Sequence, residues 1–365
     1  MLVPCFVVRN RSFNCGEKSV AGRRSCSLRL LPMPDDFQPA RVSGNPGFLP
    51  TDSESLFMIR CCSVVVFIFL SLNCTRLNAN DSPFVVAGYL PDYRVESWSR
   101  EIGPVTDLIL FGMSAPKDGT FDSNALNHQH IGIVQDVKRK TQCRLLFTVG
   151  GWNKSEGFSV LATNQTLRRT FIQDALRFCR RHGFDGIDYD WEHPAGDEQI
   201  NAFADLLAET HAEFSQQNLL VTVAQAGWQD LGRRAYQSVD RIHLMAYDHD
   251  FPQATFEKAR ADVERLQSFG CPARRITVGL PFYGRNKNGE ARTYAELSTV
   301  PAFQADASVI DGFACNGTAL IERKTRFARE CGLAGVMIWE IGQDTTGPHS
   351  LLQTLSRALE QNRSK

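Results

Sequence analysis

The sequence predicts an α/β fold, a single-domain (β/α)8 TIM barrel, and three observations lead to this prediction. Eight short apolar runs alternate with longer stretches of helical periodicity from residue 82 onward, which is the pattern of repeated βα units. Most of the runs are continuously hydrophobic, as expected for strands that are covered on both faces in a parallel sheet. The alternating region holds about 280 residues, close to the roughly 250 typical of such barrels.

The predicted strands are short runs rich in β-branched and aromatic residues. They cover Phe84–Tyr89, Asp107–Met113, Arg144–Val149, Gly183–Asp190, Leu219–Gln225, Arg241–Tyr247, Ile276–Tyr283 and Ala334–Trp339. An open, doubly wound sheet is the alternative topology. It would require a Gly-rich phosphate loop after the first strand, and Gly88-Tyr89-Leu90-Pro91 is not such a loop.

Helices are predicted between the strands, where apolar residues recur every three or four positions. The clearest stripe runs over Leu167–Cys179, and a second helix is expected over Asp197–Gln217 with Asp197 as its N-cap. Glycines at the ends of three helices are expected to let the chain turn into the next strand: Gly183, Gly270 and Gly332. The other helices are expected over Asn124–Lys140, Gln253–Phe269, Thr318–Cys331 and Ser350–Gln361.

The N-terminal 79 residues are predicted to lie outside the folded domain. The apolar run Cys61–Leu72 is too short for the roughly 20 residues of a membrane-spanning helix. Met58–Arg60 and Ala79 supply the basic start and the small cleavage-site residue of a signal peptide over residues 58–79. Residues 1–57 are then a non-translated or disordered leader, the alternative being a genuine leader before a poor membrane anchor. We expect the mature chain, residues 80–365, to be secreted or periplasmic.

The composition argues against two classes of binding partner, nucleic acids and membrane surfaces. The 40 Lys and Arg residues balance the 40 Asp and Glu residues, so the chain lacks the charge needed for sequence-independent binding to nucleic acid or to a membrane surface. Five cysteines fall within the predicted fold, at positions 143, 179, 271, 315 and 331. None forms a Cys-x-x-Cys pair, so neither a metal nor a redox site is predicted, and no cofactor is implied. Disulfide pairing stays open, and a monomer is expected.

The fourth predicted strand carries an unusual row of acids. In an extended chain, residues two apart share a face, so Asp188, Asp190 and Glu192 are predicted to point into the barrel mouth. Carboxylates stacked in a low-dielectric lumen share protons, which leaves one of them protonated near neutral pH as a general acid. Asp185 has the opposite parity and is expected to cap or hydrogen-bond the turn entering the strand.

A divalent-metal site is the alternative use of these acids. Such a site would recruit His or further carboxylates from neighbouring strand ends. Those ends offer mostly aromatic residues instead: Tyr89, Trp152, Trp228, Tyr247, Tyr283 and Trp339.

The motifs resemble those of family 18 glycoside hydrolases, the chitinases and their relatives. Asp185-x-x-Asp188-x-Asp190-x-Glu192 is similar to the family's DxxDxDxE signature. Three further segments and one residue resemble the family over Phe84 to about Glu360: Thr148-Val149-Gly150-Gly151 (with Thr for the usual Ser), Met245-Ala246-Tyr247-Asp248, the seventh strand Gly279–Gly284, and Trp339. The resemblance implies that residues 80–365 are a catalytic domain acting on N-acetylglucosamine-containing polysaccharides or oligosaccharides.

The same resemblance implies retaining hydrolysis assisted by the substrate, through an oxazolinium intermediate. Glu192 would be the acid and base, Asp190 would orient the acetamido group, and Asp188 would be its alternate partner. Tyr247, with Asp248 beside it, would hydrogen-bond the acetamido oxygen, while Trp339 would form the floor. Met245, Tyr89, Trp152 and Tyr283 are further substrate-binding candidates, and Tyr89 and Trp152 are equally explained as core or rim aromatics.

Only about 50 residues separate Tyr283 from Ala334, so we predict no α+β insertion and a shallow, endo-acting groove. Two other enzymatic readings stay open: an endo-β-N-acetylglucosaminidase on glycoproteins and a peptidoglycan-acting hydrolase. A chitin-binding lectin is the alternative outside the enzyme class. Lectins of this family usually lose the acid, whereas Glu192 is present.

Overall fold

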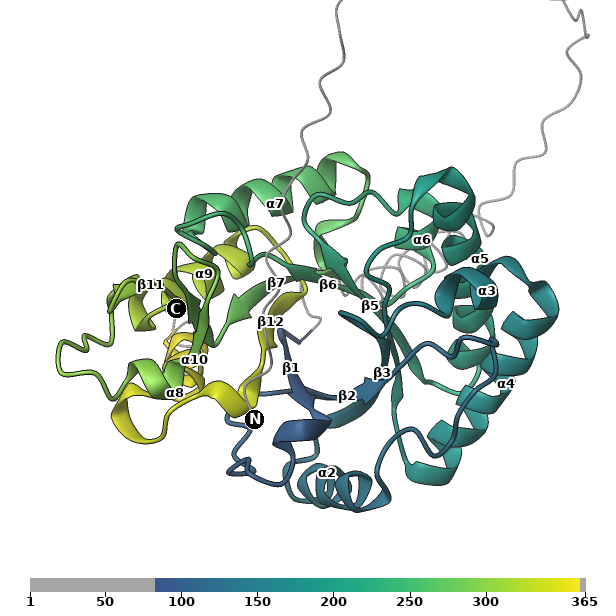
Figure 1. Ribbon diagram of the computed structural model, residues 1–365, viewed down its shortest axis with the longest axis horizontal. Coiled ribbons are helices and arrows are strands. Elements are labelled where there is room, and N and C mark those ends of the chain that lie inside the picture. The colour runs from purple at the N-terminus through teal and green to yellow at the C-terminus, as the bar shows by residue number, and fades with distance from the viewer. Residues whose placement is uncertain (1–82, 362–365) are drawn as a thin grey trace, which may run out of the picture. The chain divides into compact units, whose positions relative to one another are not determined.

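The computed structural model describes residues 83–361, and these form a closed barrel of eight parallel strands. Figure 1 looks into the barrel and shows the helices arranged around its outside. Going along the chain, the barrel strands are β1 (Val85–Pro91), β2 (Asp107–Met113), β3 (Arg144–Gly150), β4 (Gly186–Asp190), β5 (Leu220–Ala226), β6 (Arg241–Met245), β7 (Ile276–Pro281) and β12 (Gly335–Trp339). Strand β12 pairs with both β7 and β1 and closes the ring. The predicted (β/α)8 barrel is confirmed.

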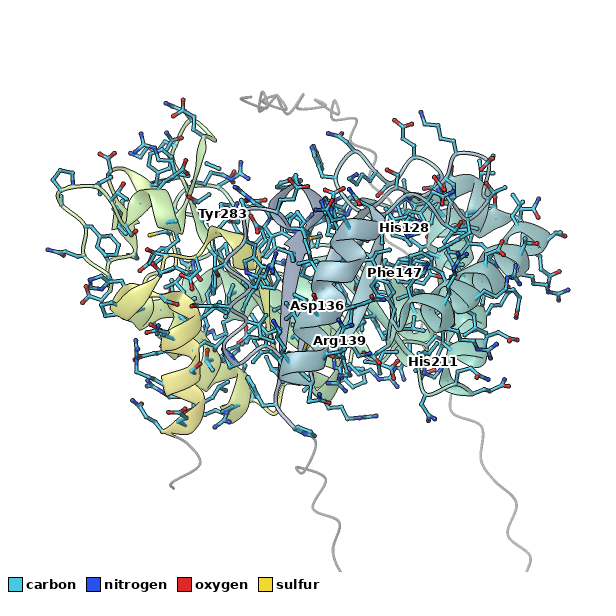
Figure 2. All side chains as sticks on the ribbon, turned by 90° about the horizontal axis from the view of Figure 1, so that it is seen from below. His128, Asp136, Arg139, Phe147, His211 and Tyr283 are labelled. Atoms are coloured by element: carbon cyan, nitrogen blue, oxygen red, sulfur yellow. The ribbon has the colours of Figure 1, made fainter. Side chains whose placement is uncertain are left out.

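Strand burial explains the continuous hydrophobic runs in the sequence. Every residue of β1, β2 and β4 is buried, because one face meets the helices and the other meets the lumen. On the outer side, Phe147 is fully buried between β3 and its covering helices, and Figure 2 labels it in that layer. On the inner side, Tyr89, Leu146 and Met337 belong to a smaller apolar cluster that fills the lumen.

Each covering helix buries one stripe and exposes the opposite face. On α2 (His128–Thr141), Val134 and Val137 are buried, while Asp136 and Arg139 form an exposed ion pair, as Figure 2 shows. The other long helices are α4 (Gln165–His182), α5 (Gly196–Ser215), α7 (Phe256–Ser268), α9 (Thr318–Glu330) and α10 (Leu351–Glu360). Helix α4 ends as expected at Gly183, whose φ of 65° is the left-handed conformation that glycine adopts freely.

Two local predictions differ from the structure. Helix α5 begins at Gly196 with Ala195 as N-cap, so Asp197 lies in the first turn rather than at the cap. The Gln199 side chain reaches back to accept the Ala195 N–H at 2.8 Å, and no side chain caps the first turn of the helix. Asp185 does form hydrogen bonds, but its Oδ2 accepts the Leu145 N–H in neighbouring β3 at 2.7 Å.

A small antiparallel sheet lies between β7 and α9. It consists of β8 (Tyr283–Arg285), β9 (Ala291–Thr293), β10 (Val309–Ile310) and β11 (Phe313–Ala314), with the one-turn helix α8 (Tyr294–Leu297) after β9. The short spacing in the sequence predicts no α+β insertion here, only a helix and loops, whereas the structure holds four short strands as well. The helix is α9, and the rest forms a compact α+β element around its own apolar cluster, which includes Leu297, Ile310 and Phe313.

The predicted leader and signal peptide, residues 1–79, fall outside the described part of the chain. Between residues 83 and 361, no helix is both long and apolar enough to cross a membrane. All five cysteines of this part are free thiols, four of them buried and Cys331 exposed.

Candidate active site

Strand β4 delivers its acids to the barrel mouth as predicted. The alternate residues point outward: the Tyr189 hydroxyl is 2.9 Å from Thr210 Oγ1 on α5, and Trp191 stacks on Phe158. Asp188 and Asp190 are therefore turned into the lumen, where they are 0% and 3% exposed, and the Glu192 side chain is 15% exposed. The row thus runs from the fully enclosed Asp188 to Glu192 at the opening.

Asp188 is held by three neutral donors. Its Oδ2 accepts Tyr89 Oη at 2.8 Å and Thr148 Oγ1 at 3.0 Å, and its Oδ1 accepts Thr222 Oγ1 at 2.6 Å. Thr148 and Thr222 are its register partners in β3 and β5. Burial raises the pKa of Asp188 to about 6, although all three hydrogen bonds act in the opposite direction.

Asp190 is buried, and few hydrogen bonds compensate for the loss of water around its carboxylate. Its Oδ1 lacks a hydrogen-bond partner among the described residues. Burial, and then the charges of Glu192 and Asp188, raise its pKa well above the usual range. The backbone is fixed nearby, because the Asp190 carbonyl accepts the Gly151 N–H at 2.6 Å. A side chain at Gly151 would meet the Phe111 ring at 2.4 Å, so glycine permits this close approach.

Glu192 sits where the lumen opens to solvent. Ser155 Oγ accepts its backbone N–H at 3.0 Å, which fixes the turn that follows β4. Burial first, and then the charge of Asp248, raise the Glu192 pKa to about 7, while a hydrogen bond from the Trp152 backbone lowers it. A hollow of about 380 Å³ adjoins the carboxylate, and its lining includes Trp152, Ser155, His193 and Gln199.

A second wall of the mouth comes from the residues that follow β6 and β7. Tyr247 and Asp248 follow β6, and the Tyr283 hydroxyl donates to Asp248 Oδ1 at 2.6 Å. Arg285 binds the same oxygen through Nη2 at 2.7 Å, so Asp248 is anchored from two sides. The Tyr247 ring lies edge-on to Tyr283, with ring centres 6.3 Å apart. Burial raises the pKa of Tyr247 well above the usual range, which keeps its hydroxyl a donor at neutral pH.

Trp339, the last residue of β12, forms an aromatic floor with two neighbours. Its ring centre is 5.1 Å from that of Phe111 and 5.6 Å from that of Tyr89. Met245 packs against the same lumen cluster. By contrast, Trp152 stands at the rim with 64% of its surface exposed. Tyr89 is thus a buried lumen residue in contact with Asp188, and Trp152 is a rim aromatic.

Sequence reasoning missed several residues that shape the site. Thr222 and Ser155 hold the acids, Phe111 supports the floor, and Arg285 anchors Asp248. Thr222 was detectable in principle, because in-register strands place a residue of β5 beside Asp188. The others come from loops or from strands whose register the sequence does not reveal.

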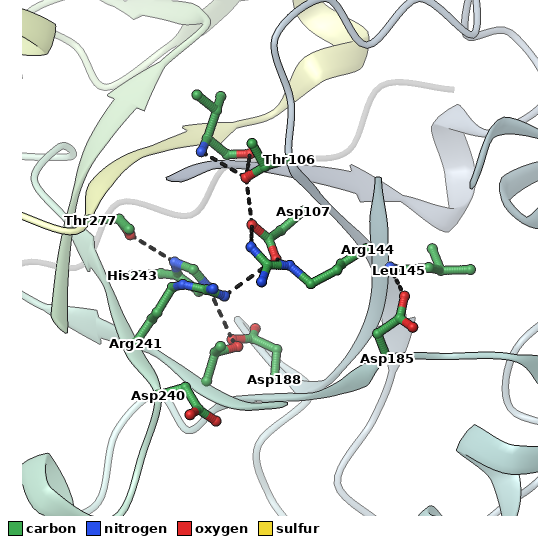
Figure 3. A network of polar contacts seen from close by, with 12 residues as sticks. Thr106, Asp107, Arg144, Leu145, Asp185, Asp188, Asp240, Arg241, His243 and Thr277 are labelled. Carbon is green, nitrogen blue, oxygen red and sulfur yellow. Dashed lines mark hydrogen bonds and ion pairs between the residues drawn. The ribbon is translucent and has the colours of Figure 1, made fainter. Parts of the chain in front are cut away.

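The N-terminal end of the barrel contains a separate polar cluster, shown in Figure 3. Asp107 Oδ1 lies 2.6 Å from Arg144 Nε and 3.3 Å from Arg241 Nη1, and Asp107 Oδ2 accepts Thr106 Oγ1 at 2.6 Å. The acid is 1% exposed. His243 lies between this cluster and the mouth, with Nδ1 at 2.8 Å from Thr277 Oγ1 and Nε2 at 3.9 Å from Asp188 Oδ1.

Comparison with known proteins places the chain in a family. The family model for glycosyl hydrolases family 18 matches residues 50–344. The chain belongs to this family. Within the described residues, no group of three or more His, Cys, Asp or Glu side chains is arranged to hold a metal ion.

Curated relatives of this family 18 chain include proteins named as chitinases and one named as a chitotriosidase. Chitinase 1 of Aphanocladium album is 26% identical over 282 residues, covering 61% of this chain and 67% of the fungal protein. Chitotriosidase-1 of Mus musculus is 26% identical over 352 residues, covering 73% of this chain and 75% of the mouse protein. The match to probable chitinase 2 of Drosophila melanogaster, at 28% identity, covers 47% of this chain and only 40% of the fly protein.

Solved structures share the fold. A chitinase from Bacteroides thetaiotaomicron superposes with a TM-score of 0.71 at 24% identity, covering 78% of this chain and 99% of that chain. A family 18 chitinase from Cycas revoluta in complex with (GlcNAc)3 gives a TM-score of 0.65 at 20% identity, covering 75% of this chain and 99% of that chain.

Proposed function

We propose that this chain is a retaining glycoside hydrolase that cleaves β-1,4 bonds at N-acetylglucosamine residues of chitin or chitooligosaccharides. The observation that carries the proposal is the row Asp188, Asp190, Glu192, in which burial raises the pKa of each acid and only the last reaches the mouth. The chitinase and chitotriosidase names of its relatives and the (GlcNAc)3 bound in the Cycas structure support the substrate class.

Glu192 acts as general acid and then as general base. Its pKa of about 7 keeps a large share of the side chain protonated at neutral pH, so it can protonate the glycosidic oxygen as the bond breaks. The substrate's own 2-acetamido carbonyl attacks the anomeric carbon and forms an oxazolinium ion. Glu192, now deprotonated, activates the water that opens this ring, and the configuration is retained.

Asp190 orients the acetamido group through its unpartnered Oδ1. A buried oxygen without a donor is costly unless a ligand supplies one, and the acetamido N–H is such a donor. Its negative charge then stabilises the positive oxazolinium ring. Asp188 is the inner partner with which Asp190 shares a proton, because two adjacent buried carboxylates do not ionise together cheaply.

The remaining predicted residues position the sugar. Tyr247 donates to the acetamido oxygen, and Asp248 is held beside it by Tyr283 and Arg285. Trp339 stacks under the distorted sugar ring, supported by Tyr89 and with Met245 in the same cluster. Trp152 offers a second exposed stacking surface at the rim.

The shallow groove and the export of the chain belong to the same proposal. The insertion between β7 and α9 is a small sheet of strands two or three residues long, which favours endo action on soluble oligomers. Signal-like residues 58–79 favour a secreted or periplasmic protein, and the proposal takes it to be a monomer.

The test is hydrolysis of N-acetylglucosamine oligomers by the mature chain, residues 80–365, followed by mass spectrometry and early-time anomer analysis. Cleavage with β-anomer product supports the proposal. An α-anomer product would contradict acetamido assistance. Release of N-glycans from a glycoprotein with no oligomer cleavage would favour the endo-β-N-acetylglucosaminidase, and saturable binding without cleavage would favour the lectin.

A further inference from the structure

Trp228 is a large exposed aromatic residue that the mechanism above does not use. It is 63% exposed and follows β5, just as Trp152 follows β3. In the barrel, β3, β4 and β5 are consecutive neighbours. The residues that follow these strands, Trp152, His193 and Trp228, therefore lie along one sector of the mouth, with the residue next to Glu192 in the middle.

The loop that carries Trp228 is firmly held on both sides. The Gly227 carbonyl accepts Arg265 Nη1 at 3.1 Å. Gln229 is 5% exposed; its carbonyl accepts Gln225 Nε2 at 2.6 Å, and its own Nε2 donates to the Pro194 carbonyl at 3.3 Å. The buried amides thus tie the Trp228 turn to the turn after β4, and an indole is presented to solvent on a preorganised support.

His193 links this indole to the acid. The His193 ring meets Trp228 edge to face, with ring centres 4.9 Å apart, and His193 Nε2 is 3.8 Å from Glu192 Oε2. On the opposite side, Trp339 belongs to β12, which is four strands away from β4 in either direction around the ring. A glycan crossing the mouth over Trp339 passes Glu192 and continues towards Trp228.

We propose that Trp228, braced by His193, is a sugar-stacking platform on the leaving-group side of Glu192. This inference rests on the proposed function and adds to it a substrate preference: chains with sugars on both sides of the cleaved bond. The indole face stacks on the apolar C–H face of a pyranose ring. The platform contributes less to substrates whose leaving group carries no sugar, because no pyranose ring reaches the indole.

The experiment compares Trp228→Ala and Trp228→Phe with the unmodified enzyme on two substrates. One is the hexamer of N-acetylglucosamine, and the other is an aryl β-glycoside of its dimer, whose leaving group is not a sugar. For Trp228→Ala we expect kcat/KM on the hexamer to fall about tenfold more than on the aryl glycoside, the size expected for one lost ring stack. The hexamer cleavage pattern should also shift towards shorter leaving fragments.

Trp228→Phe keeps an aromatic face and should recover most of the difference, while melting temperatures show whether both variants remain folded. Equal losses on the two substrates, or an unchanged cleavage pattern, would overturn the platform while leaving the hydrolase intact. If the unmodified enzyme cleaves neither substrate, the proposed function fails, and calorimetric binding of the hexamer still tests Trp228: a tenfold weaker affinity in Trp228→Ala supports the platform and an equal affinity rejects it.

Discussion

The two ends of the barrel each contain a buried aspartate, and the surroundings of the two side chains differ. At the N-terminal end, Asp107 is 1% exposed and contacts two arginines and a threonine hydroxyl. At the C-terminal end, Asp190 is 3% exposed, and its Oδ1 has no hydrogen-bond partner among the described residues. An almost fully buried aspartate therefore has ion-pair partners at one end of the barrel and lacks a hydrogen-bond partner for one oxygen at the other.

This difference indicates that the aspartate at the N-terminal end serves the stability of the fold and that the aspartate at the C-terminal end serves the reaction. A buried carboxylate that contacts cations forms ion pairs within the fold, whereas one surrounded by other acids binds protons and meets a ligand. Barrels of this type carry their active sites at the C-terminal end. The comparison predicts that variants at the mouth change turnover, and that variants at the opposite end change the free energy of unfolding.

The largest expected effect is that of Glu192→Gln. The amide cannot donate an acidic proton, so kcat should fall by about 10³ to 10⁴, the upper range for general acid–base catalysis. The change is nearly isosteric, so oligomer binding measured by calorimetry should remain within about threefold. Equal loss of turnover and binding would mean that Glu192 is not the acid.

The second prediction concerns the polar cluster at the N-terminal end of the barrel. Asp107→Asn removes the charge that compensates Arg241, whose side chain is 11% exposed, so the free energy of unfolding should fall by about 3 kcal/mol. Urea denaturation measures this loss, and kcat well below the melting temperature should stay unchanged. The matched control is Asp136→Asn in the exposed α2 ion pair, which should cost less than about 1 kcal/mol. Similar losses in both variants would remove the contrast between the two ends.

Much of this contrast was predictable from sequence, and the rest depends on contacts between distant residues. Alternation alone predicts that Asp188, Asp190 and Glu192 share one face, and the structure buries the two aspartates of β4. Asp107 and Arg241 are 134 positions apart, and no local pattern pairs them.

The misassigned elements are those with weak local signals. The strands of the small sheet are two or three residues long, too short to show a period of two. Asp197 looked like an N-cap because such residues favour that position, but the observed N-cap, Ala195, lies two residues earlier.

The third prediction is a falling alkaline limb in the pH profile of kcat/KM. Glu192 must be protonated for the first step, and burial raises its pKa to about 7. Activity should therefore fall by about tenfold per pH unit above that value, since the protonated fraction falls at that rate. An alkaline limb near 4.5, where an ordinary glutamate titrates, would contradict the burial argument.

The smallest expected effect concerns the pKa of Asp188 and its dependence on single hydrogen bonds. Thr222 Oγ1 is the donor to its Oδ1, whereas Oδ2 accepts two hydroxyls, from Tyr89 and Thr148. The Thr222 hydrogen bond lowers the Asp188 pKa from what burial alone would give, so Thr222→Val should raise it. One hydrogen bond of about 1 kcal/mol corresponds to somewhat less than one pH unit.

The acid limb of kcat/KM should move to higher pH by that amount, because Asp188 must be deprotonated to take up the proton that it shares with Asp190. Thr148→Val is the matched control: it removes a hydroxyl of the same kind from an oxygen that keeps Tyr89 as donor, so its shift should be smaller. If the two variants shift the limb equally, the oxygens of Asp188 are not distinguished. Asp188 would then act only through its total charge. The distribution of donors between its two oxygens would not affect the reaction.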